Sequence, residues 1–472
     1  MRIKHKKIFL AVIISMFCLS TFVAQGGGSE AADEGRREKF EERIEALVDF
    51  YDIPGAAVVL IEGNESGWSG YYGSADLQED IPVTEDTLFR AESITKSLTA
   101  RLVLEMTEQG LISFDEPIEK YISRWEIPES KYDREGVTVR RLLNHSSGLT
   151  GGADYTHPGE EVYPLEEILA GEHGLHRAEP VREPGTDFEY SNQGFILLEM
   201  MIAEVTGRGF ENYFREKILE PAGAEGYFTV DEDVKSRLAT SYYADGEPVP
   251  HYVDNFKAAG GLLISAEDLA SLIAAGSSLE LYSSGVKADG FYGLGADISA
   301  KGHFIDRHQG QKAVFHGGEG TGSLGMYYTF PEEGEGIVIL TNSKGSWPFL
   351  FESLDIWSEF KGLPQPEMTV KFSTITFGLN IMLAGLLVAG FIRLILLIRD
   401  IRRDKKQFDF RSVYSKKSLF YLLAAVLLIL LWWFLGEVLV SNLLPVRYDR
   451  LGLGLAFFCL TLVFSSFTAG QG

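Results

Sequence analysis

Apolar residues recur at helical spacing in one segment of the N-terminal half of the chain. Ile94, Leu98, Leu102 and Met106 stand four positions apart, and Gly110 follows them. This period puts the apolar side chains on one face of a helix, and a glycine after the last of them is typical of a helix end. The pattern therefore predicts an amphipathic helix that ends at about Gly110.

Short apolar runs separated by glycine and polar residues predict strands at both ends of one domain. Residues 55–63 and 67–73 predict a strand pair with a turn at Gly63-Asn64. Consecutive strands with tight turns are predicted later in the chain, at 292–299, 312–320, 324–334 and 336–343. Helices are predicted within 36–51, 137–152, 183–207 and 258–276. The second ends in a loop, and the last two follow loops. This order predicts an α+β fold, in which an antiparallel sheet from both chain ends packs against a helical middle.

Both ends of the sequence have the composition of membrane-targeting segments. A basic start and the apolar run Ile8–Ala24 predict a signal peptide, or an uncleaved N-terminal anchor, over residues 1–28. Three apolar stretches near the C-terminus each approach the length of a spanning helix: Phe372–Ile398, Leu419–Val440 and Leu451–Phe467. The loop at 399–417 is rich in lysine and arginine, which favours the cytoplasmic side.

These segments predict the organisation of the chain. An extracytoplasmic domain over 36–361 is followed by a linker over 362–371 and three transmembrane helices over 372–470. The expected localisation is the cell membrane, with several crossings and contacts between the C-terminal helices and membrane lipid.

Charge and cysteine content exclude several classes of function. The net charge is −24, and both ends are basic, so the predicted domain is still more acidic than the whole chain. Such a surface argues against nucleic acid as a partner. Cys18 and Cys459 both lie in apolar segments, so the domain has no disulfide, cysteine nucleophile or zinc–thiolate site. We find no H-E-x-x-H or P-loop motif, and expect neither metal nor cofactor.

A serine and a lysine stand three residues apart at the start of the first predicted helix. Ser93 and Lys96 would share a face of that helix, so the amine could reach the hydroxyl. The nearby helix N-terminus would stabilise a developing oxyanion. Ser284 and Lys287 have the same spacing, but they stand in a serine- and glycine-rich run without an apolar period.

Three motifs in order resemble the serine β-lactamase and penicillin-binding-protein superfamily, especially its class C-like branch. They are Ser93-Ile94-Thr95-Lys96, Tyr190-Ser191-Asn192 and His316-Gly317-Gly318. The resemblance runs from about Phe40 to Ser343 and implies a β-lactamase/transpeptidase-like fold.

The resemblance also implies roles for these residues. Ser93 would attack a carbonyl, with either Lys96 or Tyr190 as the general base. The backbone N–H groups of Ser93 and Glu319 would bind the oxyanion.

Substrate recognition is expected from three further groups. Asn192 would contact a substrate amide, and Gly318 would belong to the substrate-binding strand. His316 stands where many members have a lysine, so the resemblance implies weaker or pH-dependent carboxylate recognition.

The sequence thus predicts a membrane-anchored extracytoplasmic serine hydrolase that forms an acyl-serine. Its substrate could be a cell-wall D-amino-acid peptide, a β-lactam or a small ester or amide. The alternative is a membrane sensor that binds penicillin or a peptidoglycan fragment with slow or no turnover.

Overall fold

The protein divides into two compact units, Met1–Glu42 and Arg43–Gly472. The computed structural model describes residues 30–149, 155–156, 163–172, 176–250, 252–276, 281–289, 292–403, 406–408 and 468–470. The described part of the first unit is the beginning of α2 (Glu30–Tyr51), which includes the helix predicted over 36–51. The signal peptide or anchor predicted over 1–28 lies outside the described residues.

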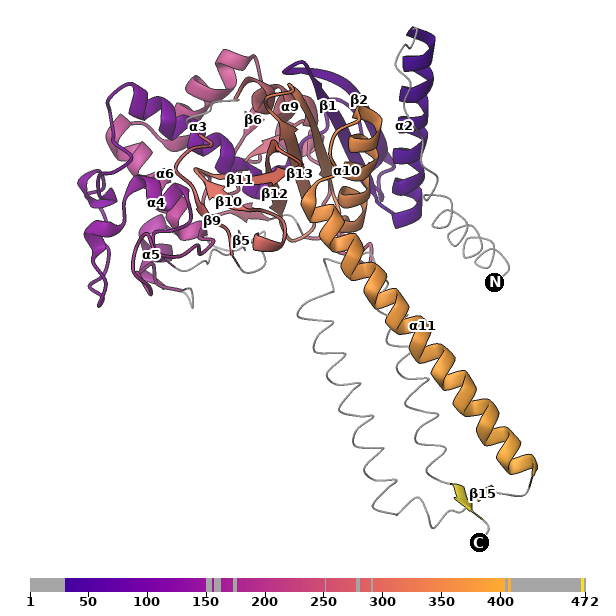
Figure 1. Ribbon diagram of the computed structural model, residues 1–472. Coiled ribbons are helices and arrows are strands. Elements are labelled where there is room, and N and C mark those ends of the chain that lie inside the picture. The colour runs from indigo at the N-terminus through magenta and orange to yellow at the C-terminus, as the bar shows by residue number, and fades with distance from the viewer. Residues whose placement is uncertain are drawn as a thin grey trace. The chain divides into compact units, whose positions relative to one another are not determined.

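The described part of the second unit contains a nine-stranded sheet in the order β3-β2-β1-β14-β13-β12-β11-β10-β9. Its strands are β1 (Gly55–Glu62), β2 (Glu65–Asp76), β3 (Ile81–Pro82), β9 (Val286–Lys287), β10 (Ile298–Ala300), β11 (His303–His308), β12 (Gln311–Glu319), β13 (Leu324–Phe330) and β14 (Glu335–Thr341). All neighbouring strands are antiparallel. Because β1 pairs with β14, indigo strands from early in the chain lie beside orange strands from its later part (Figure 1). This arrangement confirms the predicted α+β fold.

The middle of the chain is mainly helical, also as predicted. The described α-helices after α2 are α3 (Thr95–Glu108), α4 (Val139–Leu143), α5 (Leu165–Ala170), α6 (Asn192–Thr206), α7 (Phe210–Phe214), α8 (Glu232–Arg237), α9 (Ala266–Ala275), α10 (Trp347–Lys361) and α11 (Glu367–Arg402). Short helical turns of other types are η1 (Glu92–Ile94), η2 (Ile118–Lys120), η3 (Arg134–Gly136), η4 (Arg215–Leu219), η5 (Glu220–Ala222) and η6 (Tyr292–Leu294). Small sheets pair β4 (Phe89–Arg90) with β8 (Leu263–Ile264) and β8 with β6 (Gly226–Tyr227), β5 (Tyr155–Thr156) with β7 (Val253–Asp254), and β15 (Lys406–Phe408) with β16 (Thr468–Gly470).

Apolar side chains cover both faces of the large sheet. Val59 and Tyr327 belong to the same buried cluster as Leu269 of α9. Tyr328 points to the opposite face because successive side chains alternate along a strand. Its ring centroid lies 6.2 Å from that of Trp357 in α10. The sheet is therefore buried between helices, and α10, which the sequence analysis did not predict, covers one face.

The predicted turn between the first two strands is confirmed. Gly63 and Asn64 both have φ of 64°, the left-handed conformation that a type I′ hairpin turn requires at both central positions.

The predicted strand over 292–299 is wrong except for its last two residues. The chain forms η6 at the start of this range and becomes a strand only at Ile298. The Tyr292 ring stacks against Tyr190 on one side, with 4.7 Å between centroids, and against Phe304, at 5.3 Å. In this helical turn the Tyr292 ring packs between Tyr190 and Phe304, and these tertiary contacts favour the turn over a strand.

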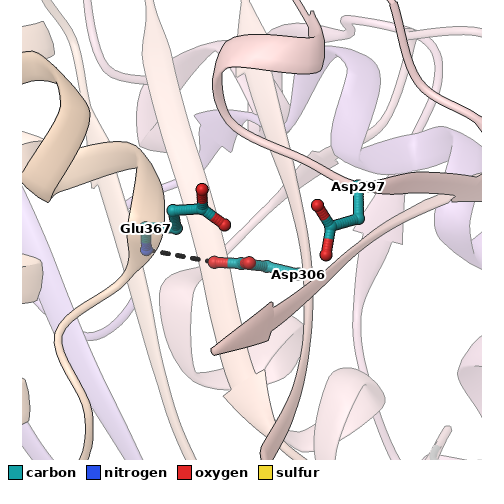
Figure 2. Close-up of side chains that lie close together, drawn as sticks. All are labelled: Asp297, Asp306 and Glu367. Carbon is teal, nitrogen blue, oxygen red and sulfur yellow. Dashed lines mark hydrogen bonds between the residues drawn. The ribbon is translucent and has the colours of Figure 1, made fainter. Parts of the chain in front are cut away.

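Helix α11 begins inside the predicted linker over 362–371. Its first backbone N–H, that of Glu367, donates to Oδ2 of Asp306 on β11 at 3.0 Å (Figure 2). Within the described residues, no helix combines the length and the apolar character needed to cross a membrane. The second and third predicted spans lie outside the described residues.

Candidate active site

Ser93 lies in η1, immediately before α3, in a backbone turn that the surrounding structure holds. The preceding residue, Glu92, has φ of 50°, a left-handed conformation that costs a non-glycine residue free energy. Glu92 is buried, and its Oε1 accepts hydrogen bonds from the hydroxyls of Tyr252, at 2.9 Å, and Ser323, at 2.8 Å. These contacts fix the backbone that carries the Ser93 hydroxyl.

The side chain of Lys96, in the first turn of α3, contacts Ser93. Its Nζ donates to Ser93 Oγ at 2.9 Å and to the backbone carbonyl of Ala259 at 2.5 Å. The side chain is fully buried, and Nζ lies 5.0 Å from the centre of the Tyr190 ring. The predicted approach of amine to hydroxyl, three residues apart on one helical face, is therefore present.

Tyr190 lines the same cavity as Ser93, from the loop before α6. Burial, followed by the nearby Tyr292, raises the pKa of Tyr190 well above its usual range. The Tyr190 hydroxyl is therefore protonated at neutral pH and can donate a proton.

The His145 ring packs against the Tyr190 ring. The ring centroids of His145 and Tyr190 lie 4.3 Å apart, and His145 Nδ1 accepts a hydrogen bond from the backbone N–H of Ser191 at 3.1 Å. Burial, and then the nearby Lys96, hold the pKa of His145 well below its usual value. His145 is thus a neutral packing residue.

His316 is a neutral hydrogen-bond acceptor at this site. Its Nδ1 lies 2.7 Å from the carbonyl oxygen of Gly317, which can only accept, so Nδ1 carries the proton and Nε2 carries a lone pair. Nε2 is buried and has no hydrogen-bond partner in the described part of the chain. Burial, and then the nearby Lys96, lower the pKa of His316 to about 3. The imidazole would therefore become charged, and able to bind a carboxylate, only at a pH below the physiological range.

Asn192 begins α6, where the Ser191 hydroxyl caps the helix by accepting from the N–H of Gly194. The Oδ1 of Asn192 is buried and, like Nε2 of His316, unpaired among the described residues. It is a second acceptor available to a substrate.

The end of β12 lies against the turn that carries Ser93. Gly318 passes so close that a Cβ there would stand 2.2 Å from the carbonyl oxygen of Ala91. One residue further on, the side chain of Glu319 pairs with Lys344 at 2.5 Å. The two predicted oxyanion donors thus belong to neighbouring segments, η1 and β12.

One cavity of about 490 Å³ joins these residues. Ser93, Tyr190, Asn192, His316 and Glu319 all line it, although they come from three distant parts of the sequence. The other predicted residues are adjacent: Lys96 hydrogen-bonds Ser93, and Gly318 contacts Ala91.

The second serine–lysine pair has a different local structure. Ser284 has φ of 57° in a turn, and Lys287 lies on the short edge strand β9. The pair therefore does not share a helical face, and neither residue lines the cavity.

Some residues of the site were not found from the sequence. The carbonyl of Ala259 that holds Lys96 belongs to the backbone, so its residue type carried no signal. Tyr292 was assigned to a strand, and its place in the aromatic stack depends on tertiary packing.

One carboxylate cluster in the described residues could hold a cation. Asp297, Asp306 and Glu367 each offer an oxygen within 4.8 Å of the others (Figure 2). Asp306 accepts from the hydroxyl of Tyr328 at 3.1 Å, and Glu367 pairs with Lys371 at 2.7 Å. Burial, and also the Glu367 carboxylate, raise the pKa of Asp306. None of the three carboxylates lines the cavity that contains Ser93.

A sheet between helices, with a serine hydroxyl hydrogen-bonded to a lysine in a cavity that a tyrosine also lines, is typical of a class of serine hydrolase. The sequence model of the Beta-lactamase family matches residues 40–356, and the chain belongs to this family.

Individual relatives agree with this assignment. Among curated proteins, the unguisins hydrolase ungD' of Aspergillus campestris is 28% identical over 231 residues, or 45% of this chain and 42% of that protein. The chain spans half or less of the length of this and two other curated relatives.

Solved structures share the fold. The octameric penicillin-binding protein homologue from Pyrococcus abyssi is 26% identical, with a TM-score of 0.57 over 70% of this chain and 78% of that one. A D-amino acid amidase from Ochrobactrum anthropi SV3 is 23% identical, with a TM-score of 0.57 over 69% of this chain and 99% of that one. The second likeness shows the fold alone.

The close approach of Gly318 to Ala91 gives a testable prediction. We expect Gly318→Ala to push β12 away from η1 and to slow acylation of Ser93 by roughly 10²-fold, since small displacements of reacting groups are costly. The measurement is the rate of labelling by a fluorophosphonate. Gly317→Ala is the matched control, because a Cβ there would meet no atom nearer than one of the Trp347 side chain, at an ordinary 3.4 Å. Equal rates for the two variants would contradict the prediction.

Proposed function

We propose that this protein hydrolyses amide or ester bonds through an acyl intermediate on Ser93. The observation that carries the proposal is the arrangement around one hydroxyl: Lys96 Nζ lies 2.9 Å from Ser93 Oγ and 5.0 Å from the centre of the Tyr190 ring, and Ser93 and Tyr190 line the same cavity. A serine close to two groups able to transfer protons has what acyl transfer requires.

The proton transfers follow from these contacts. Lys96 acts in this proposal as the general base in its deprotonated form: Ser93 Oγ attacks the substrate carbonyl carbon, and the amine of Lys96 takes the hydroxyl proton. The backbone N–H groups of Ser93 and Glu319 stabilise the oxyanion. Tyr190, protonated because its pKa is raised, gives its proton to the leaving group and regains one from Lys96. Water then releases the acyl group by the same steps in reverse.

The polar groups of the cavity favour a substrate that donates hydrogen bonds. Nε2 of His316 and Oδ1 of Asn192 are both acceptors, and both are unpaired in the described part of the chain. A substrate with N–H groups near the scissile bond would satisfy both atoms, whereas a carboxylate would satisfy neither. We therefore favour small amides, including those of amino acids, over β-lactams.

We also propose that the C-terminal part anchors the enzyme in the cell membrane, with the hydrolase domain outside. The three apolar stretches and the basic loop of the sequence support this topology. On α11, large apolar side chains are exposed, among them Phe377, Ile381 and Ile395. Retention in the membrane after carbonate washing would support anchoring, and release of the intact chain would contradict it.

The reaction is tested by mapping the site of covalent labelling. The full chain in detergent is treated with a fluorophosphonate, digested and analysed by mass spectrometry. We expect the adduct on the peptide that contains Ser93. An adduct on the peptide that contains Ser284, or no adduct at all, would contradict the proposed function.

A further inference from the structure

Helix α11 contributes to the cavity that contains Ser93. Besides the polar residues, the cavity wall contains Met326 of β13, Trp347 and Phe351 of α10, and Met368 and Phe372 of α11. All five side chains are buried. Met368 and Phe372 lie beyond residue 356, where the match to the family ends, so the match does not include this part of the wall.

Packing holds these α11 residues in the wall. The Phe372 ring stacks on Phe351 with 4.7 Å between centroids and an interplanar angle of 15°. Trp347 continues the stack, its ring centroid 5.4 Å from that of Phe351. Met368 lies against Gly295, where a Cβ would stand 3.2 Å from Met368 Cε. Together they form one continuous apolar surface.

Hydrogen bonds fix the start of the helix on two other elements. The N–H of Glu367 donates to Asp306 on β11 at 3.0 Å (Figure 2). The hydroxyl of Thr369 donates to Oδ1 of Asp355 on α10 at 2.5 Å. Since these residues flank Met368, its position depends on contacts with both elements.

The cavity therefore has two chemically different parts. One part carries Ser93 and the unpaired acceptors of His316 and Asn192. The other part is apolar, and its one unpaired polar atom among the described residues is Nε1 of Trp347, a buried donor. A substrate that fills both parts must carry a large apolar group beside its scissile amide.

We propose that the first turns of α11 form a subsite for a large apolar acyl group of the substrate, such as an aromatic side chain. This inference rests on the proposed function, because it assumes that Ser93 is the residue acylated. The substrate class it defines is amides or esters whose acyl part is bulky and apolar. Burying one such group against the wall increases the acylation rate if the contact is made in the transition state.

The test compares two phosphonate probes that differ in one substituent. Benzyl and methyl fluorophosphonates both label a reactive serine, but only the benzyl probe carries an aromatic ring that the apolar wall would bind. For the full chain in detergent we expect benzyl labelling to be at least tenfold faster. In Phe372→Ala we expect that preference to fall roughly tenfold, with little change in methyl labelling. Phe377→Ala is the matched control, since Phe377 is a phenylalanine on the same helix and is 66% exposed.

The outcomes distinguish a failure of the proposed subsite from a failure of the proposed function. Labelling of Ser93 without benzyl preference, or with a preference that Phe372→Ala leaves intact, would overturn the subsite. An equal loss of both labelling rates in Phe372→Ala would also overturn it, because the helix would then only support the fold. If neither probe labels Ser93 in the unaltered chain, the proposed function itself fails.

Discussion

Replacing Ser93 with alanine should abolish covalent labelling and lower hydrolysis by roughly 10⁴-fold or more, because no acyl intermediate can form without the nucleophile. The substitution removes one oxygen, and the side-chain contacts that hold Glu92 do not involve Ser93. The folded structure should therefore persist. The measurement is hydrolysis of a chromogenic amide or ester with an apolar acyl group, alongside the thermal unfolding midpoint.

Ser284→Ala is the control for this experiment. It alters the serine of the second serine–lysine pair, which lies in a turn before β9. We expect its activity to match that of the unaltered chain. If Ser284→Ala lost activity and Ser93→Ala kept it, the serine would be wrongly assigned.

Replacing Lys96 with methionine should slow acylation by roughly 10²- to 10⁴-fold, the usual contribution of a positioned general base. Methionine fills much of the same buried volume but cannot accept a proton. It also loses the hydrogen bonds to Ser93 and to the carbonyl of Ala259. Labelling with the methyl phosphonate measures the effect, since it reports acylation without hydrolysis.

Two further variants are compared with Lys96→Met: one is a control for the loss of a lysine, and the other tests the proton donor. Lys287→Met removes the other lysine of a serine–lysine pair and should leave the rate unchanged. Tyr190→Phe should affect hydrolysis of an amide more than labelling by a fluorophosphonate, because fluoride leaves without needing a proton. A full labelling rate in Lys96→Met, with the fold intact, would mean that the base lies elsewhere.

The parts of the structure that sequence predicted best depend on local spacing. Ser93 and Lys96 are three residues apart, so the helical period alone placed amine beside hydroxyl. The hairpin turn at Gly63-Asn64 was also predicted, because few residues tolerate its left-handed backbone. Helix α10 was missed even though Leu350, Leu354 and Trp357 stand at helical spacing.

Other parts of the site depend on contacts that no local pattern contains. The neutral state of His316 results from burial, which only the assembled fold provides. The place of Phe372 in the cavity wall depends on its stacking with Phe351. From sequence, its apolar surroundings predicted a membrane segment, and a ring that lines a cavity has the same composition as one that contacts lipid.

The left-handed backbone at Glu92 has a consequence for when the nucleophile becomes ordered. Because Tyr252 and Ser323 hold that residue, the orientation of the following peptide is set as the chain folds. Substrate binding then has little backbone entropy left to remove at the point of attack. The enzyme should meet its substrate with a rigid nucleophile, so differences in reactivity among substrates should reflect how well each fits the cavity.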